Sequence, residues 1–237
     1  ILTKEGMNPE ERIHFYGPEK NWWSRAGVPE KMPAGEPGGP DSEIFYDFGG
    51  DLKLHERSIF KDDSCNPNCD CGRFMEIGNS VFMEYLKQGD GSFNELPKKN
   101  VDFGGGLERL AAAANNNPDV FKTDLYQSII TEIEKNSSKT YGIDENTIAM
   151  RVIADHMKAA VYLVKQGVLP ANKEQGYVLR RLIRRSAVKM RSLKGSIADA
   201  KSFDSIIEAV ITIEATIDTS FDIKQDLTNI AEVIREE

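Results

Sequence analysis

Three consecutive glycines and a nearby arginine are the strongest candidate for anion-binding chemistry. Gly104, Gly105 and Gly106 follow a short apolar stretch and precede LERLAAAA, a run of strong helix formers. Glycines allow a sharp turn and a close approach to a ligand, and the first turn of a helix offers unpaired N–H groups to an anion. Arg109 falls near that first turn, where its guanidinium could bind a phosphate with two hydrogen bonds. A glycine turn that simply begins an amphipathic helix is the alternative, because the lysine of a Walker loop is missing.

A second group of candidate ligands is acidic and precedes the glycines. Residues 42–48 alternate in character, so Glu43 and Asp47 share one face of the strand that this pattern predicts. Two carboxylates on one face could hold a magnesium ion together with a nucleotide, because that ion prefers a few carboxylates plus phosphate oxygens. Acids on the solvated side of a strand are the alternative.

All three cysteines of the chain fall close together in one loop. Cys65, Cys69 and Cys71 flank an Asn-Pro-Asn turn, and thiolates this close favour a tetrahedral zinc site whose fourth ligand could be His55. Loop thiols without a metal are the alternative, because the spacing is not that of paired CxxC motifs. The sequence has neither a signal peptide nor a secreted disulfide pattern, so we expect a reducing, cytoplasmic location.

Positive charge is concentrated in one segment of a chain that is acidic as a whole. The 237 residues carry a formal net charge of −8, yet residues 151–194 hold 11 Lys and Arg against 2 Asp and Glu. The flanking segments are acidic, with 16 against 26 in residues 1–150 and 3 against 10 in residues 195–237. This distribution is typical of a polyanion-binding face on an otherwise acidic protein.

The basic segment contains a predicted helix at 177–193 with two opposite faces. The apolar face consists of Leu179, Leu182, Ile183 and Met190. The basic face consists of Arg180, Arg181, Arg184, Arg185 and Arg191. Arginine suits phosphate and base-edge contacts, which favours a nucleic-acid ligand. Docking of an acidic partner, such as the C-terminal segment of the chain itself, is another use for the same face.

The elements that must position these residues are of two kinds. Up to residue 118 the sequence predicts antiparallel strands joined by hairpins, and from residue 119 it predicts helices, including 121–134, 147–166 and 177–193. We therefore expect an α+β chain of two domains, 1–118 and 119–237. No apolar run approaches the ~20 residues that cross a bilayer. Because the chain begins with Ile1, we expect it to be part of a longer protein.

Seven segments, taken in order, resemble the alanyl-tRNA synthetases, a family of class II aminoacyl-tRNA synthetases. They are NWW (21–23), GGPDSEIFYD (38–47), EIGNSVFM (76–83), LPKKNVDFGGGLER (96–109), RVIADHMKA (151–159), GVLPANK (167–173) and GYVLRRLIRR (176–185). The resemblance implies that residues 1–118 form the carboxyl-terminal half of an antiparallel class II catalytic sheet. It implies that the all-helical part is the tRNA-recognition domain.

The resemblance also implies roles for individual residues. Asp102 would hold the ammonium group of alanine. The pocket for its methyl group would be lined by Trp23, Asn79, Val81 and Gly104. ATP, with Mg²⁺, would contact Gly106 and Glu43, and Arg109 would bind its terminal phosphate. The alanine carboxylate would attack the α-phosphate without a protein nucleophile, so catalysis would rest on positioning and charge neutralisation.

In the helical domain, the resemblance assigns Asn172 to a G·U base pair of the tRNA acceptor stem. The neighbouring phosphates would be bound by Arg180, Arg181, Arg184 and Arg185. Asparagine suits base edges and arginine suits the backbone, which agrees with this division of roles.

The chain departs from the family in its extent and at two motifs. Motifs 1 and 2 of class II enzymes should precede residue 1, and the editing and C-terminal domains are absent too. Phe103 stands where the family has threonine in Asp-Thr-Gly, and the cysteine loop is not of the commonest pattern. We therefore expect alanine–tRNA ligase activity from the parent protein and no alanyl-adenylate formation by this chain alone. A non-catalytic module that binds tRNA or another nucleic acid is the alternative.

Overall fold

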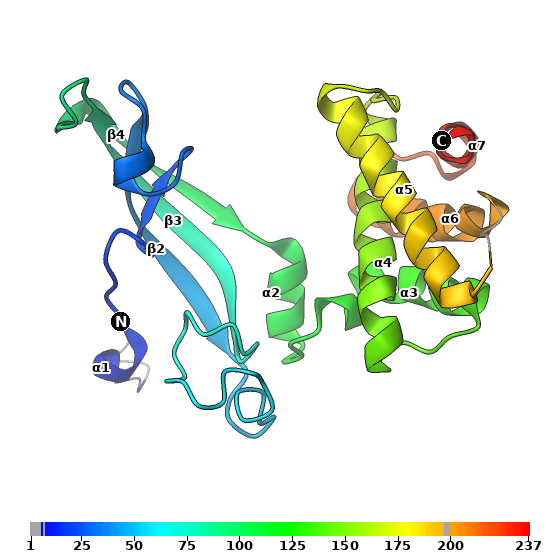
Figure 1. Ribbon diagram of the computed structural model, residues 1–237, viewed down its shortest axis with the longest axis horizontal. Helices are drawn as coiled ribbons and strands as arrows, with labels where there is room; N and C mark the ends of the chain where they lie inside the picture. Colours follow the sequence, from blue (N-terminus) through cyan, green and yellow to red (C-terminus); the bar gives the residue numbers. More distant parts are fainter. Residues whose placement is uncertain (1–5, 7, 197–199) are drawn as a thin grey trace. The chain divides into compact units, whose positions relative to one another are not determined.

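The chain is divided into two compact units, Ile1–Pro118 and Asp119–Glu237 (Figure 1). A computed structural model describes residues 6, 8–196 and 200–237. The first unit contains all the described strands, and the second is built from helices. The expected α+β class is thereby confirmed. No helix in the described part of the chain combines the length and apolar character needed to span a bilayer.

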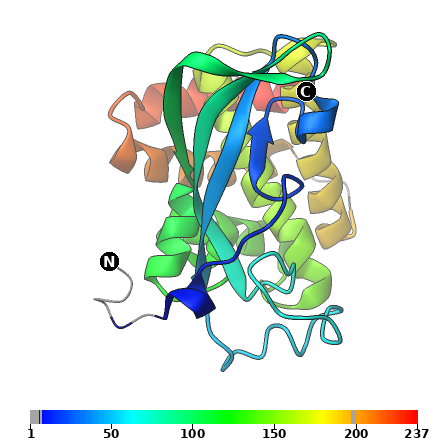
Figure 2. The ribbon, with the colours of Figure 1, turned by 90° about the vertical axis from the view of Figure 1, so that its left-hand side faces the viewer.

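The first unit is an antiparallel sheet with the strand order β1-β2-β3-β4 (Figure 2). Its strands are β1 (Trp22–Ser24), β2 (Pro37–Asp47), β3 (Phe74–Lys87) and β4 (Phe93–Gly105). Its short helices are α1 (Pro9–Arg12), η1 (Pro29–Lys31) and α2 (Leu107–Ala114). The loop between β2 and β3 carries the cysteines, and α2 follows directly from the three glycines.

Strand β2 begins earlier than the alternation at residues 42–48 indicates, because glycines allow it to pass very close to β3. A Cβ atom added to Gly39 would lie 1.8 Å from the carbonyl oxygen of Phe82, which no side chain can accept. Prolines are tolerated at the start of this strand, since Pro37 is its first residue. The glycine- and proline-rich composition of the first residues of β2 therefore does not indicate that they belong to a strand.

An irregularity in β3 decides which side chains share a face of the sheet. Glu43 pairs with Asn79, but Phe45 pairs with Glu76, so β3 has one extra residue between these pairs. A bulge of this kind breaks the strict alternation of side chains along a strand. Glu76 therefore lies on the same face as Glu43 and Asn79, although its position in the sequence would place it on the opposite one.

The second unit packs its helices around an apolar core. They are η2 (Val120–Lys122), α3 (Asp124–Ser137), α4 (Asp144–Lys165), α5 (Glu174–Lys194), η3 (Ala200–Phe203), α6 (Asp204–Ile217) and α7 (Ile223–Glu236). The helices predicted at 121–134, 147–166 and 177–193 correspond to α3, α4 and α5, with ends shifted by up to three residues. In α5, the predicted apolar face is confirmed: Leu179, Ile183 and Met190 are buried.

Candidate functional site

Strands β2, β3 and β4 bring most of the predicted catalytic residues onto one face of the sheet. Asp41 pairs with Val81, and Val81 pairs with Asp102. In the next row on the same face, Glu43 pairs with Asn79 and Asn79 pairs with Gly104. Directly paired residues on antiparallel strands project to the same side, as do residues two positions apart. Residues far apart in the sequence thus form two adjacent rows.

Trp23 lies on β1, the strand next to β2. It pairs with Gly39, which is two residues from Asp41 on β2, and its side chain is 44% exposed. The space above Gly104 is open, since a Cβ atom added there would meet nothing within 4 Å. Phe103 projects to the other side of β4, where its ring lies against Gly78 and Gly105. Phe103, which stands where the family has threonine, therefore lies on the face of the sheet opposite Asp102.

The amide of Asn79 is partly used by Asp41, a residue that the sequence interpretation missed. Nδ2 of Asn79 donates to Oδ2 of Asp41 at 3.1 Å. The remaining oxygens, Oδ1 of Asp41 and Oδ1 of Asn79, are buried and have no hydrogen-bond partner within the described residues. Buried acceptors without a donor are costly, so both are suited to a ligand that carries N–H groups.

Three carboxylates crowd at the middle of this face. Burial raises the pKa of Glu43, and the negative charges of Glu76 and Asp41 raise it further, whereas Lys20 acts in the opposite direction. Like charges this close favour the neutral acid unless a cation compensates them. Oxygen donors of this type fit Mg²⁺, which binds through one or two carboxylates together with phosphate oxygens.

Asp47 is engaged differently from Glu43, although both lie on β2. Nε and Nη2 of Arg73 donate to its two carboxylate oxygens at 2.7 and 2.9 Å, and the N–H of Gly49 donates to Oδ1 at 2.8 Å. The hydrogen bond from Arg73 holds the pKa of Asp47 below its ordinary value. Asp47 is therefore an anchor for the start of β3, and Glu43 is the freer of the two acids.

Arg109 extends from α2 back to the sheet and is held there by Glu76. Its Nη1 donates to the Glu76 carboxylate at 2.8 Å and to the Glu76 carbonyl oxygen at 3.1 Å. The side chain is still 51% exposed, so its other N–H groups can bind an anion. Gly106 caps α2 without a side-chain hydrogen bond, which leaves N–H groups of the first turn open.

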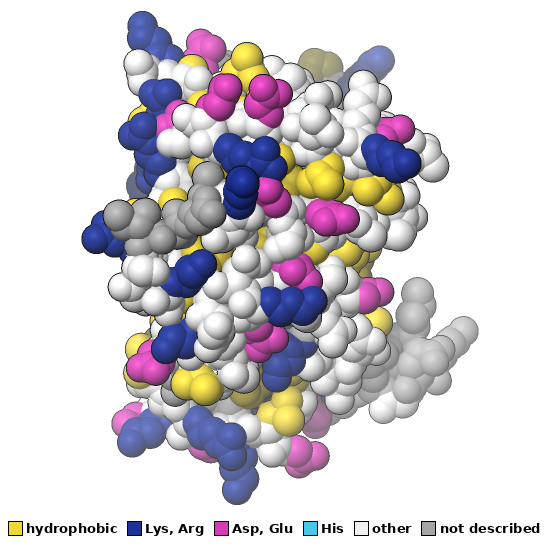
Figure 3. Space-filling model, turned by 90° about the vertical axis from the view of Figure 1, so that its right-hand side faces the viewer, with side chains coloured by type: hydrophobic (Ala, Val, Ile, Leu, Met, Phe, Trp, Pro, Cys, Tyr) yellow, Lys and Arg dark blue, Asp and Glu magenta, His cyan; other side chains and the backbone are white. Residues whose placement is uncertain are grey.

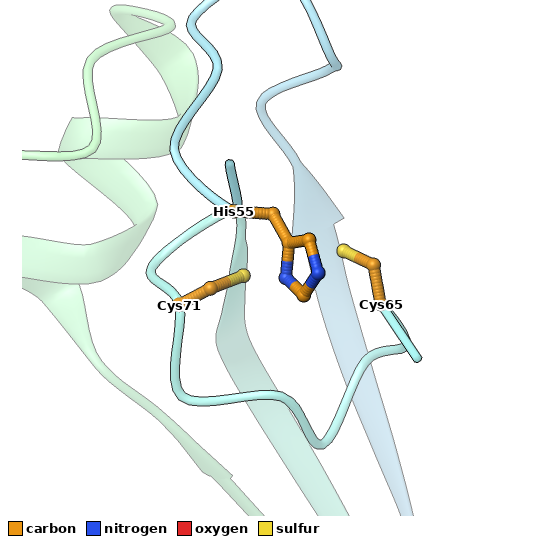
Figure 4. A group of neighbouring side chains, drawn as sticks. All are labelled: His55, Cys65 and Cys71. Atoms are coloured by element: carbon orange, nitrogen blue, oxygen red, sulfur yellow. The ribbon is translucent and has the colours of Figure 1, made fainter. Parts of the chain in front are cut away.

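The loop between β2 and β3 gathers the predicted zinc ligands. Ligand atoms of His55, Cys65 and Cys71 lie within 4.8 Å of one another, and the two sulfur atoms point toward the His55 ring from opposite sides (Figure 4). Sγ of Cys69 lies 3.5 Å from Nδ1 of His55. In a tetrahedral site with Zn–S near 2.3 Å and Zn–N near 2.0 Å, a sulfur and a nitrogen are about 3.5 Å apart. His55, Cys65 and Cys71 could hold a metal ion together, Cys69 contacts His55 beside them, and the three thiols are free.

In the second unit, two of the predicted tRNA-binding arginines are already paired with an acid. Nε of Arg180 donates to Oε2 of Glu237 at 2.9 Å, and Nε of Arg184 donates to Oε1 at 2.6 Å. Nη1 of Arg180 also donates to Oδ1 of Asn172 at 2.5 Å. The chain's C-terminal segment thus engages the basic face of α5, as one of the alternative interpretations expects.

The other two arginines are more available. Arg181 and Arg185 are exposed, and neither forms an ion pair with the described residues. The guanidinium of Arg181 lies 5.7 Å from the ring centre of Tyr177, which is itself 47% exposed. On the face in Figure 3, basic side chains alternate with acidic ones and do not form an unbroken patch.

Comparison with known proteins places the whole chain in one family. A family model described as tRNA synthetases class II (A) matches residues 1–237. The chain is 40% identical over 208 residues to an alanine–tRNA ligase of Petrotoga mobilis. The matched region covers 86% of the chain and 22% of that protein. It is 44% identical over 179 residues to the alanine–tRNA ligase of Thermotoga petrophila, covering 75% of the chain and 20% of that protein. The chain spans about a fifth of the length of these curated relatives, and it belongs to the class II (A) tRNA synthetase family.

Proposed function

We propose that the chain is part of an alanine–tRNA ligase, which activates alanine with ATP and transfers it to tRNA. The observation that carries the proposal is the shared face of β2, β3 and β4. It combines acceptors for an ammonium group, acids suited to a magnesium ion and an anchored arginine. The relatives at 40–44% identity bear the same activity in their names.

The residues of this face would act by binding and positioning. Asp102 would accept hydrogen bonds from the ammonium group of alanine, beside Asn79 and Val81 and beneath the open space at Gly104. Arg109 and the N–H groups after Gly106 would bind ATP phosphates, and Glu43 would be a ligand of Mg²⁺. When bound, Mg²⁺ supplies charge neutralisation at the phosphates. The alanine carboxylate would attack the α-phosphorus as pyrophosphate leaves, so the protein's contribution is alignment of the two reactants.

The test is alanine-dependent ATP–pyrophosphate exchange by the full-length parent protein. Asp102→Ala is expected to lower kcat/KM for alanine at least ~100-fold, because a charge-assisted contact is lost. Ser42→Ala is the matched control, since Ser42 lies on the opposite face of β2 and is exposed. Equal activity of the Asp102→Ala and Ser42→Ala proteins would contradict the assignment.

For the helical unit, we propose recognition of the tRNA acceptor stem. Asn172 would contact a G·U pair, and Arg181 and Arg185, with Arg180 and Arg184, would lie near phosphates. The exposed arginines of α5 support a phosphate-binding role, and the amide of Asn172 suits a base edge. The test is binding of an acceptor-stem hairpin that carries G·U against the same hairpin with G·C. Asn172→Ala is expected to remove the preference, and equal binding of both hairpins by the unsubstituted chain would leave only a non-specific nucleic-acid-binding module.

We also propose that His55, Cys65, Cys69 and Cys71 bind zinc. The closeness of the donor atoms of His55, Cys65 and Cys71, with Cys69 3.5 Å from His55, supports a metal site, and free thiols agree with a reducing compartment such as the cytoplasm. The chain purified without chelator is expected to contain one zinc per molecule by elemental analysis. Cys65→Ser is expected to lose most of it, whereas Ser64→Ala, at the neighbouring position, is expected to retain it. Absence of stoichiometric zinc from the unsubstituted chain would refute the site.

A further inference from the structure

Asn172 is fixed in one orientation by a chain of contacts that begins at Glu237, the residue directly after α7. Arginine has only hydrogen-bond donors, so the amide atom that faces Nη1 of Arg180 must be the oxygen of Asn172. The amide NH₂ then points away from Arg180, and it has no partner among the described residues. A freely rotating asparagine could present either an acceptor or a donor to a ligand. Held in this way, Asn172 presents a donor.

Arg180 is itself held from its other side. Its Nε donates to Glu237, whose side chain is only 7% exposed, and Arg180 is 26% exposed. A carboxylate this buried needs its partners, and each of its oxygens accepts from one arginine. Arg184 shares the acid but is 64% exposed and has no contact with Asn172. The two arginines therefore have different roles, although both belong to the same helical face.

We infer that Glu237 and Arg180 are positioning residues that fix the amide of Asn172 as a hydrogen-bond donor. The ligand chemistry that fits this arrangement is an acceptor, such as a carbonyl oxygen or an unprotonated ring nitrogen of a base edge. The effect on selectivity rests on the proposed function, in which Asn172 contacts a base pair. The orientation of the amide does not depend on that proposal. Glu237, at the C-terminal end of α7, would thus contribute to selectivity through Arg180, without contacting the base pair itself.

The orientation is tested first without RNA, by NMR relaxation of side-chain amides in the ¹⁵N-labelled chain. The Asn172 signal is identified by its loss in Asn172→Ala. Arg180→Ala and Glu237→Gln are expected to increase the ps–ns mobility of this amide, whereas Arg184→Ala is expected to leave it unchanged. An Asn172 amide that is equally rigid, or equally mobile, in all these proteins would overturn the inference.

The functional consequence is tested with the G·U and G·C hairpins at fixed salt. A base-edge contact typically gives about 5- to 150-fold discrimination. Arg180→Ala and Glu237→Gln are expected to reduce the G·U preference at least ~3-fold. Arg184→Ala should weaken the binding of both hairpins by the same factor and so keep the ratio of their affinities.

Asp204→Asn is the control for the anchoring of α7, because Asp204 of α6 pairs with Arg235 of α7 and has no hydrogen bond with Asn172. It is expected to keep the ratio. If Asn172→Ala lowers the preference but Arg180→Ala and Glu237→Gln do not, the positioning inference is wrong. If the amide becomes mobile as expected but Asn172→Ala leaves the preference intact, the proposed base reading fails and the orientation stands.

Discussion

Replacing Gly39 by alanine tests whether the close approach of β2 to β3 is needed to build the candidate site on these strands. The added Cβ would lie 1.8 Å from the carbonyl oxygen of Phe82 and 2.8 Å from its carbonyl carbon. Contacts under 3.0 Å do not persist, and both of these atoms belong to the backbone, so no side chain can rotate away. Strands β2 and β3 must separate at the point where the register of Asp41 is set.

The cost can be worked from this geometry. Overpacking of a close-packed site costs about 1–3 kcal/mol, and each ladder hydrogen bond lost nearby adds about 1 kcal/mol. A total near 3 kcal/mol is expected. With a urea slope of about 2 kcal/mol/M, the unfolding midpoint should fall by ~1.5 M.

Tryptophan fluorescence is the suitable assay, because both tryptophans of the chain lie on β1. Trp22 stacks on Tyr85 of β3 with ring centres 6.0 Å apart, so its signal reports the packing of the strand unit. Gly50→Ala is the control, since a Cβ atom there meets nothing within 4 Å and the backbone is not in the left-handed region. If Gly39→Ala and Gly50→Ala unfold within ~0.3 M urea of each other, the steric argument is refuted.

Other consequences are accessible to simpler measurements. The pKa of Asp47 is lowered in the folded chain, so its ion pair stabilises the fold above the ordinary pKa and this stability is lost as pH falls through the lowered value. Asp47→Asn is therefore expected to cost about 1 kcal/mol in urea unfolding at pH 7, and this cost should become smaller as the pH falls below the ordinary pKa of a carboxyl group. Burial raises the pKa of Tyr141 to about 12. In an ultraviolet titration, Tyr141→Phe should therefore lack one phenol that ionises near pH 12 in the unsubstituted chain. Because the folded state favours the neutral phenol, its contribution to stability should be complete below pH 10 and be lost as the pH rises through about 12. Ile153 is 0% exposed, and Ile153→Ala is expected to destabilise the helical unit by ~2–5 kcal/mol in unfolding followed by circular dichroism. In hairpin binding across a salt series, Arg185→Ala should reduce the slope by about 0.9, whereas Arg180→Ala should change it little because that arginine already has an acid partner.

Sequence patterns predicted the helices well because each pattern is local. The apolar face of α5 is read from residues three and four positions apart, and Leu179 and Met190 are buried as expected. The α+β class follows from the same change of period near residue 119. Helix ends were less accurate, since α4 begins at Asp144 and α5 at Glu174, several residues before the first strongly periodic position.

The candidate site on β2, β3 and β4 was predicted only in part, because its assembly depends on the register between the strands. Asn79 and Asp102 came from the family resemblance, and strand alternation alone would have put Glu76 on the wrong side. Asp41 lies two residues before Glu43, a signal that could have placed it on the same face. Its contact with Asn79 depends on the pairing of β2 with β3, which a single sequence does not specify.

The pairing of Arg180 and Arg184 with Glu237 could not be assigned to a residue from sequence. Arg180 and Arg184 are 57 and 53 residues from Glu237 in the sequence, and acidic side chains are frequent throughout residues 195–237. An acidic C-terminal segment was a reasonable partner in general terms, since opposite charges favour association. Only the packing of the helices selects this one carboxylate.

Both units hold their candidate phosphate-binding arginines with acids from other elements. Glu76 anchors Arg109, and Glu237 anchors Arg180 and Arg184. An anchored arginine loses little side-chain freedom when a ligand binds, but the ligand must share or replace the acid, so net affinity is smaller than a count of arginines suggests. The exposed fractions of Arg109 and Arg180 distinguish the roles of these two arginines. Arg109, at 51%, can hold Glu76 and still bind a phosphate, whereas Arg180, at 26%, is committed to the internal contacts that orient its neighbour. The bulge that turns Glu76 toward this face therefore also positions Arg109 for the proposed phosphate contact.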